Sequence, residues 1–235
     1  MLANWNIKTA TKTNTLNRTL TATVLCGVMH FVGAIGMLYG PRDWFLMLTP
    51  FNLLVTFFLL LWTVPEKNKK LYILFSATFL IGVSVEMVGI KTGWIFGQYS
   101  YGTTLGFKFN GVPLLIGINW FIIVYSSGIL ALRLRKIFTT LHSKTNKPAY
   151  SKWIGSSVII DGAVIATLFD LIMEPAAVKL GFWSWQSGTI PMINYLSWFL
   201  ISTVILLIFH KTSPLQHQFA INLLLIQALF FMVLR

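Results

Sequence analysis

The 235 residues are 56% apolar and only 10% charged, with 19 Phe and 9 Trp, whereas an ordinary soluble domain has about a quarter charged residues. This composition indicates an integral membrane protein. The 18 basic residues outnumber the 6 acidic ones and give a net charge of +12. In a polytopic protein such an excess is typical of basic cytoplasmic loops, so we expect no nucleic-acid partner. The single Cys26 provides neither an intramolecular disulfide nor a metal-ligand pattern, so we expect no metal.

Apolar runs long enough to cross a bilayer recur along the whole chain, since about 20 residues are needed for a hydrocarbon core of roughly 30 Å. We predict an all-α, polytopic fold that forms a single transmembrane domain over residues 1–235, with short loops. The seven predicted spans are residues 20–38, 44–64, 71–89, 113–132, 153–173, 192–209 and 218–233. The first run has no small-residue cleavage site and is too long for a signal-peptide core, so we predict a retained span.

The distribution of Lys and Arg predicts the orientation. With the N-terminus in the cytoplasm of a cell-membrane protein, thirteen of the 18 basic residues lie inside: Lys8, Lys12, Arg18, Lys67, Lys69, Lys70, Arg133, Arg135, Lys136, Lys144, Lys147, Lys152 and Lys211. The five outside are Arg42, Lys91, Lys108, Lys179 and Arg235. This bias satisfies the positive-inside rule and predicts that the N-terminus is cytoplasmic.

Four of the six acidic residues fall inside or at the ends of predicted spans, where an ionised carboxylate costs roughly 2.5 kcal/mol or more at the bilayer centre. Asp170 and Glu174 are four residues apart, so they share one helical face, while Asp161 points to the opposite face. Glu86, Asp170 and Glu174 lie near the outer ends of their spans and are expected to converge at one depth. We predict that these three form a functional cluster, whereas a hydrogen-bonded structural role suits Asp161 equally well.

Two loops on the predicted outer face, residues 92–102 and 181–185, are rich in Gly and aromatic residues instead of polar ones. An interfacial aromatic belt explains the Trp and Tyr residues but not the glycines. Re-entrant loops that line a cavity are an equally good interpretation, because Gly permits close backbone approach. His30 and Asn52, inside the first two spans, are interpreted as helix–helix hydrogen-bonding groups.

Two stretches share one order of features: an acid, an aromatic loop, a helix started by Pro, then Asn and Trp. The first runs from Glu86 to Trp120 and the second from Glu174 to Trp198. In the predicted topology both point the same way, which fits a parallel repeat about an axis along the membrane normal. Chance similarity between loops explains the likeness equally well.

Several motifs together resemble the integral-membrane carotenoid biosynthesis family of carotenoid hydratases, which includes γ-carotene 1′,2′-hydratases and bisanhydrobacterioruberin hydratases. In the first half they are residues 86–93 (EMVGIKTG), 96–101 (FGQYSY), 111–113 (GVP) and Asn119-Trp120. The likeness continues through residues 170–175 (DLIMEP), where the family often has Asp before the Pro, then 183–185 (WSW), Ile190-Pro191, Asn194 and Trp198. It covers roughly residues 75–210.

This resemblance implies a hydro-lyase that adds water, without a cofactor, across the terminal carbon–carbon double bond of an acyclic carotenoid end group and forms a tertiary alcohol. It implies a lipophilic carotenoid substrate, a surrounding of membrane lipid, and other carotenoid-pathway enzymes as candidate partners. The residues suit this chemistry, because protonating an alkene needs an acid kept neutral until it acts. The tertiary cation then needs aromatic faces nearby.

We expect Asp170 to donate the proton, because it lies one turn deeper than Glu174, and we expect Glu174 and Glu86 to hold the attacking water. The pocket is expected in the outer half of the membrane, between the third to sixth spans, with an opening to lipid. The candidate substrate-binding residues are Tyr99, Tyr101, Asn119, Trp120, Trp183, Trp185, Asn194 and Trp198.

Three other functions compete with hydration. A membrane lycopene-type carotenoid cyclase uses the same acid initiation but excludes water. A proton-coupled small-molecule transporter also uses intramembrane acids, and it requires a water-accessible path through both faces in place of a dead-end pocket. A retinal photoreceptor requires a Lys in the last span, and residues 218–233 contain none.

Overall fold

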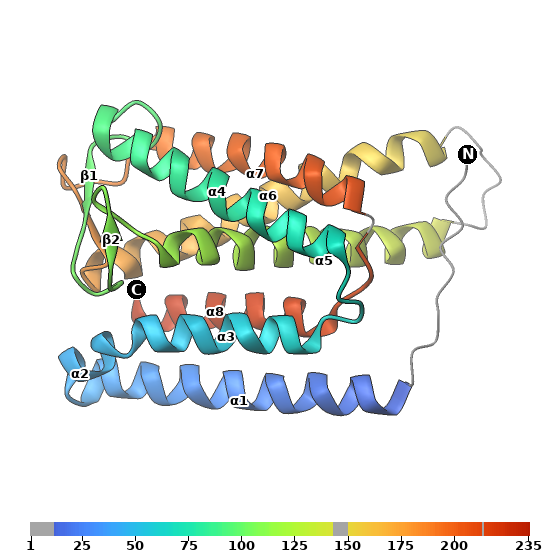
Figure 1. The fold of residues 1–235 in the computed structure, drawn as a ribbon, viewed down its shortest axis with the longest axis horizontal. Coiled ribbons are helices and arrows are strands. Elements are labelled where there is room, and N and C mark those ends of the chain that lie inside the picture. Colours follow the sequence, from blue (N-terminus) through green and yellow to red (C-terminus); the bar gives the residue numbers. More distant parts are fainter. Residues whose placement is uncertain (1–11, 143–149, 213) are drawn as a thin grey trace.

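The computed structural model describes residues 12–142, 150–212 and 214–235. Lys8, Lys144 and Lys147, which entered the charge count, lie outside this part of the chain. The described chain is mostly helical, as predicted. Its helices are α1 (Lys12–Tyr39), α2 (Arg42–Met47), α3 (Thr49–Thr63), α4 (Lys69–Thr92), α5 (Leu115–His142), α6 (Tyr150–Lys179), α7 (Met192–Thr212) and α8 (Gln218–Leu234). Apart from the short α2, they run back and forth along one bundle axis (Figure 1).

Four helices in the described residues are long and apolar enough to cross a membrane: α1 from Leu16, α4, α5 as far as Thr140, and α7. Two further apolar helices, α3 and α8, are shorter. The apolar side chains that α1 leaves exposed, including Leu16, Leu20 and Phe31, fit a lipid surrounding. These features are those of a membrane protein.

Helix α5 lies at the centre of the bundle and contacts α3, α4, α6, α7 and α8. Its residues 120–129 are all buried, as expected for a helix that is apolar on every side. Helix α1 lies at the edge of the bundle and packs against α8, α3 and α2. The core is therefore organised around α5, with α1 as an outer layer.

The helices depart from the predicted spans at two prolines. The predicted span 44–64 is divided into α2 and α3, with the break at Leu48. Pro50 lies in the first turn of α3, where a residue without a backbone N–H starts a helix well but cannot continue one. By contrast, α6 continues through Pro175 to Lys179 and not only to Met173. Close packing of the fully buried Ala176 and Ala177 holds this turn although Pro175 donates no hydrogen bond.

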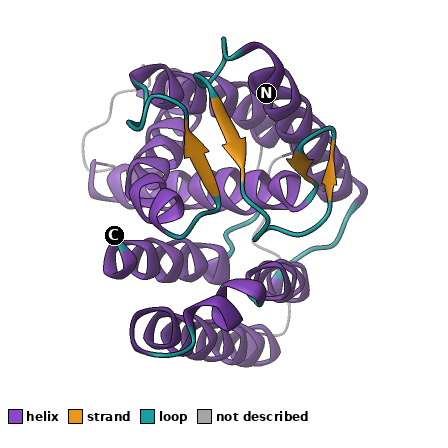
Figure 2. Ribbon diagram, turned by 90° about the vertical axis from the view of Figure 1, so that its left-hand side faces the viewer, coloured by secondary structure: helices purple, strands orange, loops and turns teal. Residues whose placement is uncertain are grey.

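The two aromatic loops, for which a re-entrant form was one interpretation, form short strands that lie across one end of the bundle (Figure 2). Strand β1 (Tyr99–Tyr101) pairs antiparallel with β4 (Trp183–Trp185). Strands β2 (Lys108–Phe109) and β3 (Val112–Pro113) form a second pair. Gly181 directs the chain from α6 into β4: it has a φ of +73°, and the N–H of Phe182 bonds to the carbonyl of Ala177 at 2.9 Å, a helix C-cap that favours glycine.

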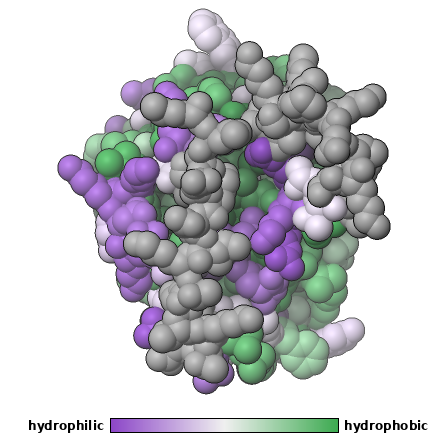
Figure 3. Space-filling model, turned by 90° about the vertical axis from the view of Figure 1, so that its right-hand side faces the viewer, coloured by the Kyte–Doolittle hydropathy of each residue, from purple (hydrophilic) through white to green (hydrophobic). Residues whose placement is uncertain are grey.

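The opposite end of the bundle carries many of the basic residues. Lys67, Lys69 and Lys70 precede α4 or begin it, and Arg133, Arg135 and Lys136 lie in the last part of α5. Figure 3 looks onto this end and shows hydrophilic side chains gathered in front of apolar ones. The two ends of the bundle therefore differ: one is basic and the other is covered by aromatic strands.

Candidate active site

The β1–β4 sheet presents four aromatic side chains to the end of the bundle. In the antiparallel register Tyr99 lies opposite Trp185 and Tyr101 opposite Trp183. Because successive residues of a strand point to opposite faces, these four share the inner face. Ser100 and Ser184, which face each other between them, are exposed, and their Oγ atoms are 3.4 Å apart. The sheet is thus a cover with an inner face of hydrogen-bond donors.

Glu86 of α4 is buried and accepts hydrogen bonds from three aromatic side chains. The Tyr101 hydroxyl donates to its Oε2 atom at 2.8 Å, the Tyr99 hydroxyl donates to the same oxygen, and Trp120 Nε1 donates to Oε1 at 3.0 Å. Burial and the neighbouring Glu86 carboxylate raise the pKa of both tyrosine hydroxyls above their usual value. Both tyrosines therefore keep their protons and act as donors, and three donors together stabilise the carboxylate form of Glu86.

Glu174 of α6 is held in a corresponding way. Trp183 Nε1 and Trp185 Nε1 each donate to its Oε2 atom at 3.0 Å. Its other oxygen, Oε1, lies 3.4 Å from the amide nitrogen of Asn194, which is a long hydrogen bond. Oε1 is therefore the oxygen of Glu174 with spare capacity to carry a proton.

Asp170, one turn before Glu174, is fully buried. Asn194 Nδ2 donates to its Oδ2 atom at 2.8 Å, while Oδ1 is buried without a hydrogen-bond partner among the described residues. Within the described chain, the three carboxyls accept hydrogen bonds from Tyr, Trp and Asn side chains and from no Lys or Arg. Three unneutralised negative charges in one buried cluster are prohibitively costly. The cluster therefore retains protons, and Asp170, which has the fewest donors, is best suited to hold one.

Glu86 and Glu174 face a chamber of about 20 Å³, which is room for about one water molecule. The expected substrate-binding residues all line it, together with Phe96, Ile116 and Met173: Tyr99, Tyr101, Asn119, Trp120, Trp183, Trp185, Asn194 and Trp198. The structure therefore brings these eight side chains together around one chamber. The chamber itself has no room for the chain of a polyene.

Asp170 does not line this chamber. Its link to the chamber runs through Asn194, which lines the wall and bonds to it. The expectation that Asp170 donates the proton stays a prediction, and its access to the chamber depends on Asn194 of the neighbouring helix as well as on its depth along α6. Asp161 is exposed on the same helix, in agreement with its predicted position on the opposite face.

Two glycines of α4 let the aromatic residues approach Glu86. A Cβ atom on Gly82 would lie 2.8 Å from the ring of Trp120, and one on Gly89 would lie 2.8 Å from the ring of Phe96 and 3.1 Å from the Tyr99 hydroxyl. Both glycines lie on the Glu86 face of the helix, four residues before it and three after it. Trp120 in turn stacks on Trp198 with ring centroids 3.9 Å apart, which forms an aromatic wall beside the carboxyls.

The two units of the proposed repeat correspond in their hydrogen bonds. Glu86 receives donors from the strand after its own helix and from Trp120 on the next helix. Glu174 likewise receives donors from the strand after its own helix and from Asn194 on the next helix. The antiparallel pairing of β1 with β4 and the stacking of Trp120 on Trp198 join the two units. The donors on the next helices, Trp120 and Asn194, are not equivalent positions of the two units, and the repeat stays a prediction.

A larger cavity of about 380 Å³ lies beside the chamber, between α1, α2, α3 and α8 on one side and the central helices on the other. Most of its lining is apolar, and it shares Ile116, Asn119, Met173 and Trp183 with the chamber. The substrate pocket was expected between the third to sixth spans. This cavity is also lined by residues of the first two spans and of the last. Exposed Trp44 and Phe51 lie at its lining.

Comparison with known proteins then places the chain. Residues 47–235 match the model of the carotenoid biosynthesis protein family. The chain belongs to this family. It is similar to bisanhydrobacterioruberin hydratase of Haloarcula japonica, with 28% identity over 152 residues, which are 62% of this chain and 46% of the relative. The chain thus matches about half the length of this curated relative. No solved structure matches the chain.

The residues that build the larger cavity of this carotenoid biosynthesis protein were not predicted as a site. His30 and Asn52 were interpreted as helix–helix hydrogen-bonding groups, and Gln227 was not considered. In the structure His30 bonds to the carbonyl of Cys26 in its own helix at 2.8 Å, and Asn52 Oδ1 has no partner within the described residues. The available signal was the presence of polar side chains inside three separate apolar spans.

Proposed function

We propose that this protein is a carotenoid hydratase, a hydro-lyase that adds water across the terminal double bond of an acyclic carotenoid end group. The observation that carries the proposal is the pair of glutamates on a chamber with room for one water, next to a large apolar cavity. Family membership and the similarity to a hydratase support it. The activity, the substrate and the use of acid catalysis are inferences of this proposal.

In the proposed reaction Glu174 donates its Oε1 proton to the less substituted carbon of the alkene, which leaves a tertiary cation. The Trp183 and Trp185 donors stabilise the carboxylate that forms on Glu174. The stacked Trp120 and Trp198 rings face the cation. Glu174 is favoured over Asp170 as donor because it lines the chamber, whereas Asp170 does not.

Water attack completes the addition. Glu86, stabilised as a carboxylate by three donors, orients one water and accepts the proton that this water loses when its oxygen bonds to the cation. Asp170 remains neutral and keeps Asn194 turned toward Glu174. Proton transfer back from Glu86 to Glu174 through the next water restores the starting state. The reaction needs no cofactor in this scheme.

The polar chamber favours hydration over the cyclase and transporter activities. A cyclase has to keep water away from the cation, whereas the chamber is walled by two carboxyls and two amides and is large enough for water. A proton-coupled transporter needs a path through both faces, whereas this chamber lies at one end of the bundle under the β1–β4 cover.

Expression in a host that produces lycopene or γ-carotene tests the proposal, with pigment mass as the readout. We expect a product heavier by one water. Glu174→Gln is expected to lower it at least about a hundredfold, whereas Asp170→Asn, which preserves a neutral side chain, is expected to lower it about tenfold or less. Asp161→Asn, an exposed change of the same kind on the same helix, is the control. Near-normal hydration by Glu174→Gln would move the donor role to another residue.

The proposed arrangement in the cell membrane has seven spans: α1, α2 with α3, α4, α5, α6, α7 and α8. The N-terminus is cytoplasmic, and the acid cluster lies at the outer end of the bundle, opposite the basic end. The carotenoid enters from the lipid, since a polyene dissolved in the bilayer has no route through water. Other enzymes of the carotenoid pathway are candidate partners for delivering it.

A further inference from the structure

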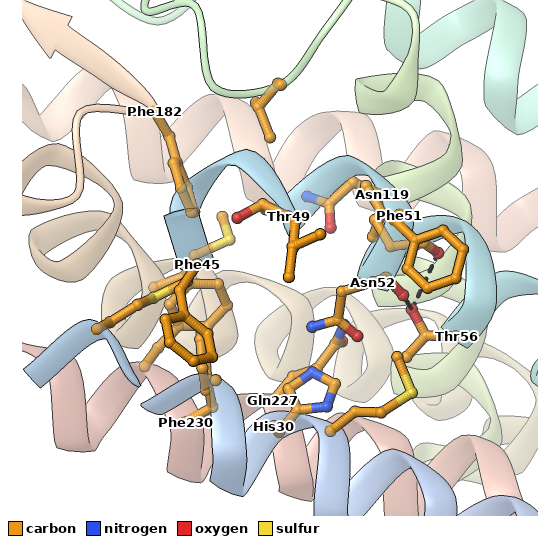
Figure 4. A pocket seen from close by; sticks show the side chains of 18 of the residues that line it. His30, Phe45, Thr49, Phe51, Asn52, Thr56, Asn119, Phe182, Gln227 and Phe230 are labelled. Atoms are coloured by element: carbon orange, nitrogen blue, oxygen red, sulfur yellow. Dashed lines mark hydrogen bonds between the residues drawn. The ribbon is translucent and has the colours of Figure 1, made fainter. Parts of the chain in front are cut away.

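The larger cavity contains a second group of polar side chains that the proposed hydration does not use. His30 of α1, Asn52 of α3 and Gln227 of α8 all line it. Figure 4 shows these three side chains near one another, with Thr49 and Asn119 of α5 farther from His30 and Gln227. Three helices that contribute nothing to the carboxyl cluster thus bring three polar groups together.

His30 offers a hydrogen-bond acceptor to this cavity. Its Nδ1 atom lies 2.8 Å from the backbone carbonyl of Cys26, and a carbonyl only accepts, so Nδ1 carries the hydrogen. In the neutral ring Nε2 is then an acceptor. The ring packs edge-on against Phe230, with centroids 5.3 Å apart, which fixes its orientation.

The side-chain oxygens of the other two members lack partners in the described chain. Within the described chain, Asn52 Oδ1, Gln227 Oε1 and Thr49 Oγ1 are buried and have no hydrogen-bond partner. Gln227 as a whole is only 6% exposed. Buried polar atoms without a partner are rare in folded proteins, and each calls for an explanation such as a ligand or an ordered water. Several such atoms around one cavity indicate a site that is completed by something bound in it.

The rest of the lining restricts the chemical class of the ligand. Phe45, Phe230 and Met37 are among the many apolar side chains around the cavity. No Lys, Arg, Asp or Glu of the described residues lines it, so a charged headgroup would be uncompensated there. A neutral hydroxyl fits, because it donates to one acceptor and accepts from an amide N–H.

We propose that His30, Asn52 and Gln227 form a recognition site for a hydroxyl group carried by a long apolar ligand. The inference rests on the proposed function in that it specifies the substrate class: polyenes or isoprenoids that bear an oxygen on the end that enters the cavity. The terminal double bond is placed at the chamber by the shared wall at Asn119 and Trp183. The hydroxyl is then bound in the larger cavity, away from the chamber.

Ligand binding, and not turnover, tests this site. The purified chain in nanodiscs is titrated with tritiated geranylgeraniol and with the hydrocarbon in which hydrogen replaces its hydroxyl, each at the same mole fraction in the lipid. We expect the alcohol to bind about five- to tenfold more tightly. In the Asn52→Leu/Gln227→Leu double variant we expect this preference to fall below about twofold while the hydrocarbon still binds.

Met37→Leu, which exchanges one apolar lining residue for another, is the control and is expected to keep the preference. If the double variant binds neither ligand, the two single variants decide, and each is expected to lower the preference about threefold. Equal binding of both ligands by the wild type, as when the group merely holds water, overturns the inference, and so does a preference that survives in the Leu variants. If the protein hydrates a carotenoid but does not prefer the alcohol, only the inference is overturned. If it prefers the alcohol but does not hydrate a carotenoid, only the proposed function is overturned.

Discussion

Each of the two glutamates accepts two hydrogen bonds from the strand that follows its own helix, so the state of each carboxyl depends on a few aromatic side chains. Trp183 and Trp185 share one oxygen of Glu174. In the proposed reaction this oxygen gains negative charge when Glu174 gives up its proton. The hydrogen bonds from the two indole N–H groups are therefore stronger after proton transfer than before it.

Trp183→Phe tests this role. It preserves an aromatic face but removes one donor to Glu174, so we expect turnover to fall about tenfold with little change in substrate binding. Steady-state assays of the purified protein measure both. Trp94→Phe is the control, because Trp94 is 84% exposed. An unchanged turnover in Trp183→Phe would show that this hydrogen bond does not support the reaction.

At the scale of residues, the sequence predicted which acids converge, because Glu86, Asp170 and Glu174 lie at equivalent ends of their spans. It did not predict which of them is accessible. That property depends on Asn194, whose amide contacts Asp170 at 2.8 Å and also lines the chamber. Spacing along one helix contains no information about a side chain that approaches from the next helix.

At the scale of elements, the active end is built by close approach of the β1 segment to α4. Gly89→Ala tests this approach, since its Cβ atom would meet the Phe96 ring and the Tyr99 hydroxyl. We expect the donors to Glu86 to be displaced and hydration to fall about ten- to hundredfold, because small misplacements near a reacting centre are costly. Pigment analysis in the producing host measures this loss.

Gly27→Ala on α1 is the matched control, because no atom lies within 4 Å of its added Cβ. It is expected to behave as the wild type. Full activity of Gly89→Ala would mean that the β1 segment is free to move away from α4 without affecting the reaction.

The helices were predicted well where apolar runs are long. Helix boundaries and strand pairs that depend on a few residues were predicted poorly. Seven apolar segments were placed on the helices, and the prolines were the exceptions: Pro50 begins a new helix, whereas Pro175 does not end one. The pairing of β1 with β4 was not predicted. Strands of three residues lack the length for a recognisable alternation, and their partners are 84 residues apart in the case of Ser100 and Ser184.

At the scale of the whole molecule, the proposed topology has the β1–β4 cover outside the cell and the basic end inside. Cys26 is the single cysteine and is buried, so an introduced cysteine reports its own position. We expect Ser100→Cys to react with a membrane-impermeant thiol reagent in intact cells and Lys67→Cys to react only after permeabilisation. Both parent side chains are exposed. The reverse pattern would invert the proposed topology.

The large cavity is also a property of the whole molecule, and this explains why the sequence did not reveal it. Its lining comes from α1, α2, α3 and α8 together with residues of the central helices and the loops. No local pattern marks such a space, because it arises where helices distant in sequence pack without filling the volume between them. The motifs that carry the family resemblance lie within residues 75–210, and the first and last helices lie outside this range.

The most direct test of the central claim is to follow the oxygen atom of water. The purified chain in nanodiscs is given an acyclic carotenoid in ¹⁸O-labelled water with no added cofactor, and the product is analysed by mass spectrometry. The account predicts a tertiary alcohol that carries one ¹⁸O atom, formed by the wild type and Asp161→Asn but at least about a hundredfold less by Glu174→Gln. An unlabelled product, a cyclised isomer of unchanged mass, or equal labelling by Glu174→Gln would contradict it.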